Sequence, residues 1–484
     1  MEARFGTSLT ALIAAIVLNT VARAAEHAPP LVIRDVTIIS PERAAPLQHA
    51  HVRIRDGLIA EISDKPLEEK QQIDGRGRFL IPGLIDSHVH VRTIPGMVPP
   101  HRAAHPDIAA MADAQEPRSY LYFGYTTVLS LGDTAPAIKQ WNEMDIRPDA
   151  YFCGGTPMVN GYSYRGPTET PYFIYNPDQV SSLPAGVDPK NQTPEAVVAA
   201  MARDGAICVK SYRESGFGSF TGKLPVPSVE LIQRVVKAAH ERNMPVFLHA
   251  NSREAHAFAV QAGVDVLAHG MWNGHSSTPE KLSDGVEPIL KDTLNRRMGY
   301  QPTSQVIRGL AEVLNNAFLD DPLLTHVYPA KLLAWYRSPE GAWFRNEELG
   351  DVDVRVFNGG TRAGDSAVGY LARNDARLLF GTDTPSAPVY TNPPGLNGFY
   401  EMRRWVAAGV SLKQILQAAT LENARIMRLD RQIGTVEKGK RAHLVLLRAN
   451  PLESVEAYNT VETVFLAGRP IKREDLSARN APAK

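Results

Sequence analysis

Residues 79–90 of the chain read FLIPGLIDSHVH, an apolar run that pauses at Pro82-Gly83 and ends in two histidines one residue apart. Successive side chains of a β-strand point to opposite faces, so Asp86, His88 and His90 are expected to share one face. Two imidazoles on one face can reach the same cation, and neutral imidazole is the commonest metal ligand. Because a lone H-x-H pair arises easily by chance, the prediction of a metal site depends on the strands that follow.

Further apolar runs of strand length alternate with segments whose apolar residues recur at helical spacing, among them residues 229–239 and 397–408. This alternation is typical of a parallel α/β architecture. The eight strands that we predict end at His90, Ser130, Gly154, Lys210, His249, His269, Thr303 and Asp383. Eight parallel strands predict an α/β fold with a closed, TIM-like (β/α)8 barrel, whose active site lies at the carboxyl ends of the strands.

Short β-rich segments at both ends of the chain predict a second, smaller domain. The first segment contains a hairpin-type turn at Asp56-Gly57, and a similar alternation of strand and turn returns near the C-terminus. We therefore expect residues 28–78 and 433–476 to form one small β-sandwich domain, and residues 79–432 to form a barrel domain.

Two connections in the predicted barrel are too long to be plain loops. Residues 160–188 are rich in tyrosine, and residues 304–375 carry Trp335 and Trp343 on partly helical sequence. At the top of a barrel, such insertions would form lids or pocket walls. Surface elaboration or an oligomer contact is an equal alternative.

The N-terminus has the pattern of a secretory signal. Arg4 precedes an apolar run over residues 9–18, and Ala22-Arg23-Ala24 follows. The apolar run is too short to span a bilayer, and the small-x-small triplet resembles a cleavage site. We therefore expect residues 1–24 to be a signal peptide and the protein to be secreted or periplasmic, without a membrane anchor. A buried helix of the mature fold is the alternative.

Charge and cysteine content narrow the classes of partner. The 484 residues include 52 basic and 52 acidic side chains, and this balance gives no reason to expect nucleic acid as a partner. We expect a small-molecule substrate, and the sequence is compatible with either a monomer or a homo-oligomer. The two cysteines, Cys153 and Cys208, lie in apolar, strand-like runs. One disulfide is conceivable in an oxidising compartment, but the pattern favours buried thiols.

Reactive side chains end five of the predicted strands. They are His88 and His90 on the first strand, Lys210 on the fourth, His249 on the fifth, His269 on the sixth and Asp383 on the eighth. A single such histidine is usually a hydrogen-bonded core residue. Four histidines, an aspartate and a lysine at the ends of apolar strands predict a metal centre.

At these residues the chain resembles the amidohydrolase superfamily, and the resemblance runs from about residue 30 to about residue 475. The matching motifs are residues 82–90 (PGLIDSHVH), 124–128 (GYTTV), 267–270 (LAHG), 381–384 (GTDT), 418–424 (AATLENA) and 434–439 (GTVEKG). Within the superfamily the chain is most similar to the imidazolonepropionase-like and prolidase-like branch, which includes Xaa-Pro-type carboxypeptidases and amidases.

The resemblance implies a (β/α)8 barrel, a small flanking β-sandwich and two divalent metal ions, for which zinc is the default and iron or manganese stays open. By position, His88, His90 and Asp383 would hold one ion, and His249 and His269 the second. Lys210 would bridge the two ions as a carbamate. The alternative is an unmodified lysine that pairs with Asp383 beside a single ion.

These residues predict a binuclear metal hydrolase that cleaves the amide bond of an N-acyl amino acid or a dipeptide-like substrate. Asp383 would relay the proton to the leaving amine, and Tyr212 and Arg213 would bind a substrate carboxylate. One alternative is a mononuclear iron or zinc enzyme that opens a cyclic amide, and another is a non-catalytic binding module. The chain departs from the family pattern at Asn251, where many relatives have a histidine, and at His443, which replaces an aspartate.

Overall fold

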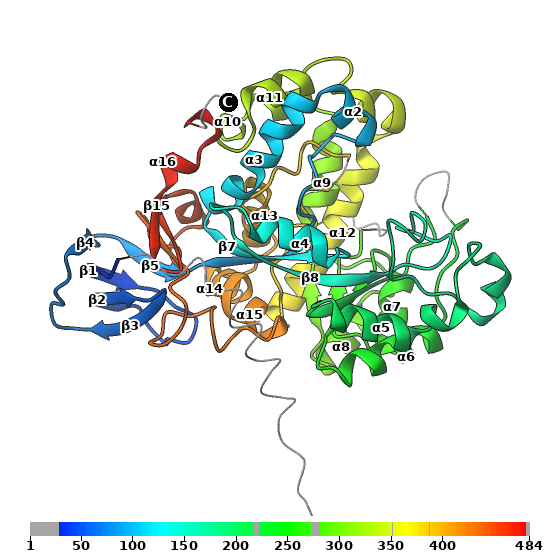
Figure 1. Ribbon diagram of the computed structural model, residues 1–484, viewed down its shortest axis with the longest axis horizontal. Helices are drawn as coiled ribbons and strands as arrows, with labels where there is room; N and C mark the ends of the chain where they lie inside the picture. Colours follow the sequence, from blue (N-terminus) through cyan, green and yellow to red (C-terminus); the bar gives the residue numbers. More distant parts are fainter. Residues whose placement is uncertain are drawn as a thin grey trace, which may run out of the picture.

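The computed structural model describes residues 29–216, 222–272, 278, 281–350, 352–386 and 388–480. The described part contains two β-sheets, and most of the helices pack around the seven-stranded parallel sheet (Figure 1). The predicted signal peptide, residues 1–24, lies outside the described residues.

A seven-stranded parallel sheet carries the candidate site. Its strands follow one another in chain order: β6 (Leu84–Val89), β7 (Tyr125–Leu131), β8 (Asp149–Thr156), β9 (Cys208–Tyr212), β10 (Val246–His249), β11 (Val266–Ala268) and β12 (Gly299–Gln301). Every neighbouring pair is parallel, so each connection crosses back over the sheet. All seven carboxyl ends therefore meet at one edge, as the strand pattern predicted.

Helices supply these crossovers and continue to the C-terminus. They are α2 (Pro99–Ala104), α3 (Pro106–Tyr122), α4 (Ala135–Asn142), α5 (Pro194–Arg203), α6 (Val229–His240), α7 (Arg253–Ala262), α8 (Glu287–Asn295), α9 (Ser304–Val313), α10 (Leu324–Val327), α11 (Ala330–Tyr336), α12 (Val354–Arg373), α13 (Leu396–Ala407), α14 (Leu412–Gln417), α15 (Asn423–Ile426) and α16 (Arg473–Leu476). The predicted helices over 229–239 and 397–408 are confirmed as α6 and α13. In α6, the Ser228 hydroxyl accepts from the Leu231 N–H and caps the first turn.

The predicted eighth strand is irregular in the structure. Leu378 forms a single parallel bridge to Tyr300 of β12, and Thr384 forms another to Val89 of β6. Between them, the Asp383 N–H donates to the His88 carbonyl at 2.7 Å. Asp383 has a left-handed backbone with φ 56°, which a regular strand cannot contain. The prediction of eight regular strands was therefore wrong for this segment, although it lies against both edge strands.

Strands from both ends of the chain form the second sheet. Its order is β15 (Arg469–Lys472), β14 (Val461–Leu466), β13 (Leu444–Leu447), β5 (Phe79–Pro82), β1 (Leu31–Ile38), β2 (Leu47–Arg55) and β3 (Leu58–Ser63), with β4 (Gln71–Asp74) paired to β1. The Ile59 N–H donates to the Lys440 carbonyl, and the Ala442 N–H donates to the Gly57 carbonyl, both at 2.8 Å. These bonds link β3 to the segment before β13, so two parts of the sheet that are distant in its strand order meet.

Residues 79–90 contribute one strand to each sheet. β5 pairs with β1 and β13, and β6 pairs with β7 in the parallel sheet. The change of sheet occurs at Gly83, whose N–H donates to the His443 carbonyl at 2.8 Å. A Cβ at Gly83 would overlap the Thr126 side chain, so only glycine allows this close approach.

The two long insertions differ in regularity. Residues 304–375 are largely helical, and Figure 1 shows α10 and α11 beside α2 and α3 at the top of the molecule. Residues 160–188 contain only one short 3₁₀ helix, η1 (Pro177–Ser182), among the described residues. The other short helices are η2 (Pro189–Gln192), η4 (Asn316–Asp320), η5 (Phe344–Leu349), η6 (Ala418–Glu422), η7 (Val455–Asn459) and η8 (Ala478–Asn480).

Cys153 and Cys208 form a disulfide, so the prediction of buried thiols was wrong. The two residues are 55 positions apart in the chain, but they are direct partners in the register of β8 and β9, with Cα atoms 4.4 Å apart. Their side chains belong to a buried apolar cluster that also includes Leu129 and Phe247. The disulfide therefore joins two strands inside the core.

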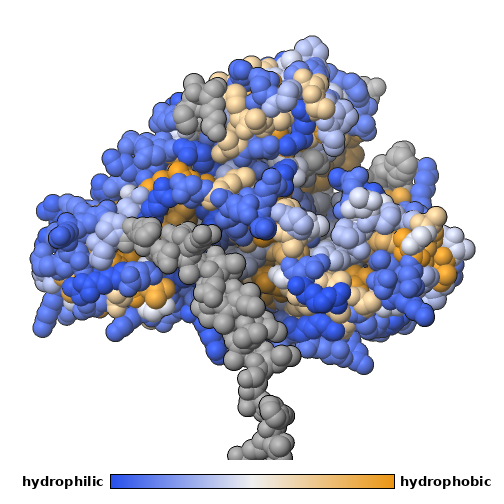
Figure 2. Space-filling model, in the orientation of Figure 1, coloured by the Kyte–Doolittle hydropathy of each residue, from blue (hydrophilic) through white to orange (hydrophobic). Residues whose placement is uncertain are grey.

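The surface in Figure 2 is mostly hydrophilic, with apolar side chains in scattered patches. Within the described ranges, no helix is both long enough and apolar enough to cross a membrane.

Candidate metal centre

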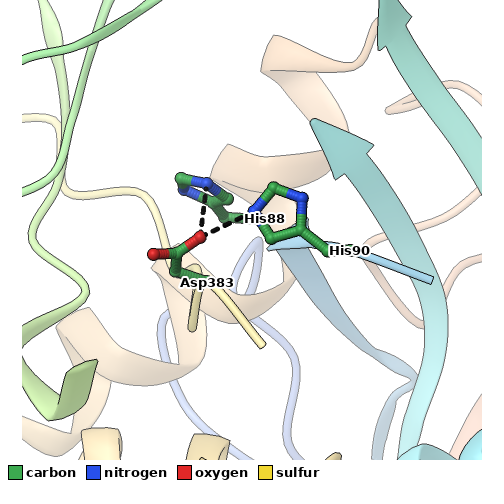
Figure 3. A group of neighbouring side chains, drawn as sticks. All are labelled: His88, His90 and Asp383. Atoms are coloured by element: carbon green, nitrogen blue, oxygen red, sulfur yellow. Dashed lines mark hydrogen bonds and ion pairs between the residues drawn. The ribbon is translucent and has the colours of Figure 1, made fainter. Parts of the chain in front are cut away.

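His88, His90 and Asp383 form a compact group of potential metal ligands (Figure 3). One ligand atom from each residue lies within 4.8 Å of the others. Asp383 Oδ1 is 2.8 Å from His90 Nε2 and 3.1 Å from His88 Nε2. The two histidines lie at the end of β6, and Asp383 arrives from the irregular segment after α12. Residues almost 300 positions apart thus face one point.

The other three predicted ligands lie beside this group. Lys210 Nζ is 3.5 Å from His88 Nε2, and His269 Nδ1 is 3.9 Å from Asp383 Oδ2. The rings of His249 and His269 have centroids 4.5 Å apart. The structure therefore brings all six residues together at the carboxyl ends of the strands.

Burial keeps the inner histidines neutral. It lowers the pKa of His88 to about 3, assisted by the positive charge of Lys210. Burial also lowers the pKa of His249, and it lowers the pKa of His269 well below its ordinary value. A neutral imidazole has a lone pair for a cation, so this donor set of imidazoles and a carboxylate fits a divalent metal ion.

Lys210 and Asp383 are shifted in ways that also suit the site. Burial lowers the pKa of Lys210 to about 7, so a large share of this amine is neutral at pH 7. Burial alone would raise the pKa of Asp383, but electrostatic interactions and hydrogen bonds with His88 and the neighbouring histidines lower it well below the usual range. Asp383 is therefore an ionised carboxylate at neutral pH.

Two residues at the end of β12 orient the histidines, and the sequence reasoning missed both. Gln301 Oε1 is 2.7 Å from His88 Nδ1, and Thr303 Oγ1 is 2.9 Å from His269 Nδ1. Gln301 Nε2 in turn donates to the Ser87 hydroxyl at 2.7 Å, which leaves its oxygen to accept from the His88 ring. His88 Nε2 then has its lone pair toward Asp383 and Lys210. Both residues lie in the predicted seventh strand, and their position at its end was the available signal.

The backbone at the site is strained at three positions. His269, Thr303 and Asp383 have φ values of 90°, 44° and 56°, in the left-handed region that non-glycine residues rarely adopt. Strain of this kind costs about 1–3 kcal/mol per residue and is concentrated at functional sites. The residue types at these three positions do not predict the left-handed backbone.

The structure separates the two predicted substrate-binding residues. The Tyr212 ring lies 6.1 Å from the His249 ring, and Lys210 Nζ lies 5.9 Å from the Tyr212 ring. Arg213 faces the other way, and its guanidinium lies 5.5 Å from the ring of Phe258 on α7. Tyr212 thus borders the site, whereas Arg213 packs on a covering helix.

Two further aromatic residues border the site. The Tyr162 ring, from the 160–188 insertion, is 4.6 Å from the His249 ring. The Trp272 ring is 4.9 Å from the His269 ring, and Trp272 also lies against Gly360 of α12. The 160–188 insertion therefore borders the candidate site directly through Tyr162, whereas the 304–375 insertion packs behind Trp272 through Gly360.

Comparison with known proteins identifies the family. Residues 79–285 and 361–471 match the model of the Amidohydrolase family, which is more than half of the chain. The chain belongs to this family.

Curated relatives match only in part. An adenine deaminase from Oleidesulfovibrio alaskensis is 30% identical over 104 residues, which cover 20% of this chain and 18% of that protein. A dihydroorotase from Geobacillus kaustophilus is 35% identical over 102 residues, which cover 20% of this chain and 21% of that protein. The chain thus spans about a fifth of the length of these relatives.

Solved structures match the fold over nearly the whole chain. A Xaa-Pro dipeptidase with bound methionine in its active site superposes with a TM-score of 0.64 and 21% identity. The match covers 92% of this chain and 100% of that chain. At this level of identity the likeness shows the fold alone.

Proposed function

We propose that this protein is a metal-dependent hydrolase that cleaves an amide bond, in a substrate such as an N-acyl amino acid or a dipeptide. The observation that carries the proposal is the convergence of four histidines, one lysine and one aspartate at the carboxyl ends of the parallel strands. His88, His90 and Asp383 would hold one divalent ion, most simply zinc, and His249 and His269 a second ion.

Lys210 would join the two ions as a carbamate. The neutral amine attacks carbon dioxide, a C–N bond forms, and one proton is released. The product is an anion whose two oxygens can each face one cation, whereas an ammonium group would repel both. The lowered pKa of Lys210 supports this reaction, because only the neutral amine is a nucleophile.

Asp383 would move the proton. Bound divalent ions supply Lewis acidity and lower the pKa of water from about 15.7 to near 7. The Asp383 carboxylate accepts a proton as water attacks the carbonyl carbon, and then donates it to the leaving nitrogen. The C–N bond breaks, and the amine leaves in neutral form. General acid–base help of this kind contributes about 10²–10⁴ in rate.

The surroundings of the site support a substrate with an apolar group. Tyr162, Tyr212 and Trp272 border the metal centre, and their rings would pack against an apolar acyl or side-chain group. Tyr212 can donate a hydrogen bond to a substrate carboxylate. We also propose that the protein is exported, which the N-terminal pattern and the Cys153–Cys208 disulfide support.

A second candidate is a mononuclear enzyme that opens a cyclic amide. The observation in its favour is that, among the described residues, only His88, His90 and Asp383 form a tight group of potential ligands. One bound ion would need no bridging carbamate.

Metal content and a substrate screen test both candidates. Elemental analysis of the metal-replete protein should give about two ions per chain, and a panel of N-acyl amino acids, dipeptides and cyclic amides should show turnover of a linear amide. One ion, an unmodified Lys210 by intact-protein mass and turnover of a cyclic amide alone would establish the second candidate. A protein without bound metal and without turnover would refute both.

A further inference from the structure

Glu214 is a buried carboxylate that lies beside His249 and outside the group of predicted metal ligands. It follows β9, two residues after Tyr212, and its side chain is only 5% exposed. Glu214 Oε2 lies 3.6 Å from His249 Nε2. A buried carboxylate needs partners, so its immediate contacts indicate what it does.

Both oxygens of Glu214 are held in place. The Asn251 side-chain amide donates to Oε2 at 2.8 Å, and the Gly216 N–H donates to Oε1 at 2.8 Å. Asn251 is itself buried, two residues after His249 on the same chain segment. The contact gives Asn251 a structural role, because its side-chain amide binds the carboxylate.

The three buried histidines of the metal centre share a pattern. In each, one ring nitrogen faces a side-chain oxygen, and the pairs are His88 with Gln301, His269 with Thr303, and His249 with Glu214. The first two partners are neutral, whereas the third is a carboxylate. A carboxylate beside a ligating histidine fixes the tautomer and makes the ring a stronger ligand.

We propose that Glu214 is a positioning residue for His249, which directs the lone pair of this ring at the second metal ion. An ionised carboxylate only accepts hydrogen bonds, so it selects the tautomer with the proton on Nε2. The lone pair is then on Nδ1. A small rotation of the ring shortens the 3.6 Å separation to the roughly 2.8 Å of a charge-assisted hydrogen bond. This inference rests on the proposed function, since it assumes an ion at His249.

The experiment compares Glu214→Gln with wild type in cobalt-substituted protein. Competition with a chelator measures the affinity of each ion, and the visible absorption of cobalt reports the ligand field. Loss of the carboxylate should lower the affinity for one ion by about 10–100-fold and change the absorption band of that ion. The affinity for the other ion and its absorption should stay as in wild type. Glu230→Gln, an exposed glutamate on α6, is the matched control and should change neither readout.

Asn251→Ala is a second variant that leaves the carboxylate in place. It removes the hydrogen bond from Asn251 to Glu214 Oε2, so it should lower the affinity for the same ion by a smaller factor. This variant keeps the test valid if Glu214→Gln does not fold.

The outcomes separate this inference from the proposed function. If wild type binds two ions and cleaves amides, while Glu214→Gln keeps both affinities and the cobalt spectrum, the positioning role is refuted and the proposed function stands. If wild type binds no second ion, the binuclear function and this inference both fail.

Discussion

At the scale of single residues, Asp383 combines an ionised carboxylate with contacts to His88 and His90. The Asp383→Asn variant keeps the shape of the side chain but cannot accept a proton. We expect kcat for an amide to fall by about 10²–10⁴, with the fold intact. The loss should be smaller for an activated ester, because a good leaving group needs less protonation.

The control for this variant is Asp375→Asn. Asp375 is exposed and has a similar left-handed backbone, with φ 53°, but it lies away from the metal centre. It should retain wild-type kcat on both substrates. Equal losses on ester and amide in Asp383→Asn, with metal content unchanged, would mean that Asp383 orients the nucleophile and does not carry its proton.

The lowered pKa of Lys210 predicts how the free energy of unfolding of the metal-free, carbonate-free protein depends on pH. The unfolded lysine keeps its proton up to pH 10.5, whereas the folded one loses it near pH 7. Between these values the unfolded state binds one more proton, so the free energy of unfolding rises with pH by up to about 1.4 kcal/mol per pH unit. The Lys210→Met variant has no amine at this position, so its free energy of unfolding lacks this contribution to the pH dependence.

Urea denaturation of both proteins from pH 6 to 10 measures the effect. The stability of wild type relative to Lys210→Met should be level below about pH 7 and should increase above it. Burial lowers the pKa values of His88, His249 and His269 in the folded state, and their contribution near pH 6–7 is common to both proteins and cancels in the comparison. A difference that does not vary with pH would mean that the buried lysine keeps an ordinary pKa.

At the scale of elements, the disulfide holds β8 against β9 two residues before Lys210. It closes a loop of 55 residues, and a disulfide of this span stabilises a protein by about 2–4 kcal/mol. The Cys153→Ala/Cys208→Ala double variant should therefore unfold at a lower urea concentration. Reduction of wild type should have a similar effect, and reduction of the double variant should have none. An unchanged midpoint in the double variant would show that packing of the two strands suffices.

The exchange of sheets at Gly83 could be foreseen only in part. The Pro82-Gly83 break is visible in residues 79–90, and it correctly divides the apolar run. That the two halves belong to different sheets depends on pairing with β13, more than 350 residues later in the chain. The local sequence pattern predicts the break between the two strands, whereas the sheet that each strand joins depends on pairing with distant segments of the chain.

At the scale of the whole molecule, the 160–188 insertion brings the Tyr162 ring to the candidate metal site. Tyr162→Ala should raise KM about tenfold for a substrate with a large apolar acyl group, equal to about 1.4 kcal/mol of lost binding, and should affect the N-acetyl analogue much less. Tyr164→Ala is the matched control, since Tyr164 lies in the same insertion but contacts Phe173. Equal KM changes for both substrates would remove Tyr162 from the acyl-binding wall.

Several properties of the site follow from the sequence by itself. Apolar strands that end in polar residues predicted the parallel architecture and the carboxyl edge where His88, His90, Lys210, His249 and His269 meet. These predictions succeed because strand alternation, apolar burial and the direction of parallel strands depend on neighbouring residues and on chain order.

Only the tertiary structure decided the rest. It paired Cys153 with Cys208, turned Arg213 toward α7, made the segment before Asp383 irregular, and placed Gln301, Thr303 and Glu214 beside the histidines. Each of these features depends on which strands are neighbours or on a strained backbone that distant packing holds in place. Contacts between residues tens to hundreds of positions apart are not encoded in any local pattern, so the fold must form before they can be identified.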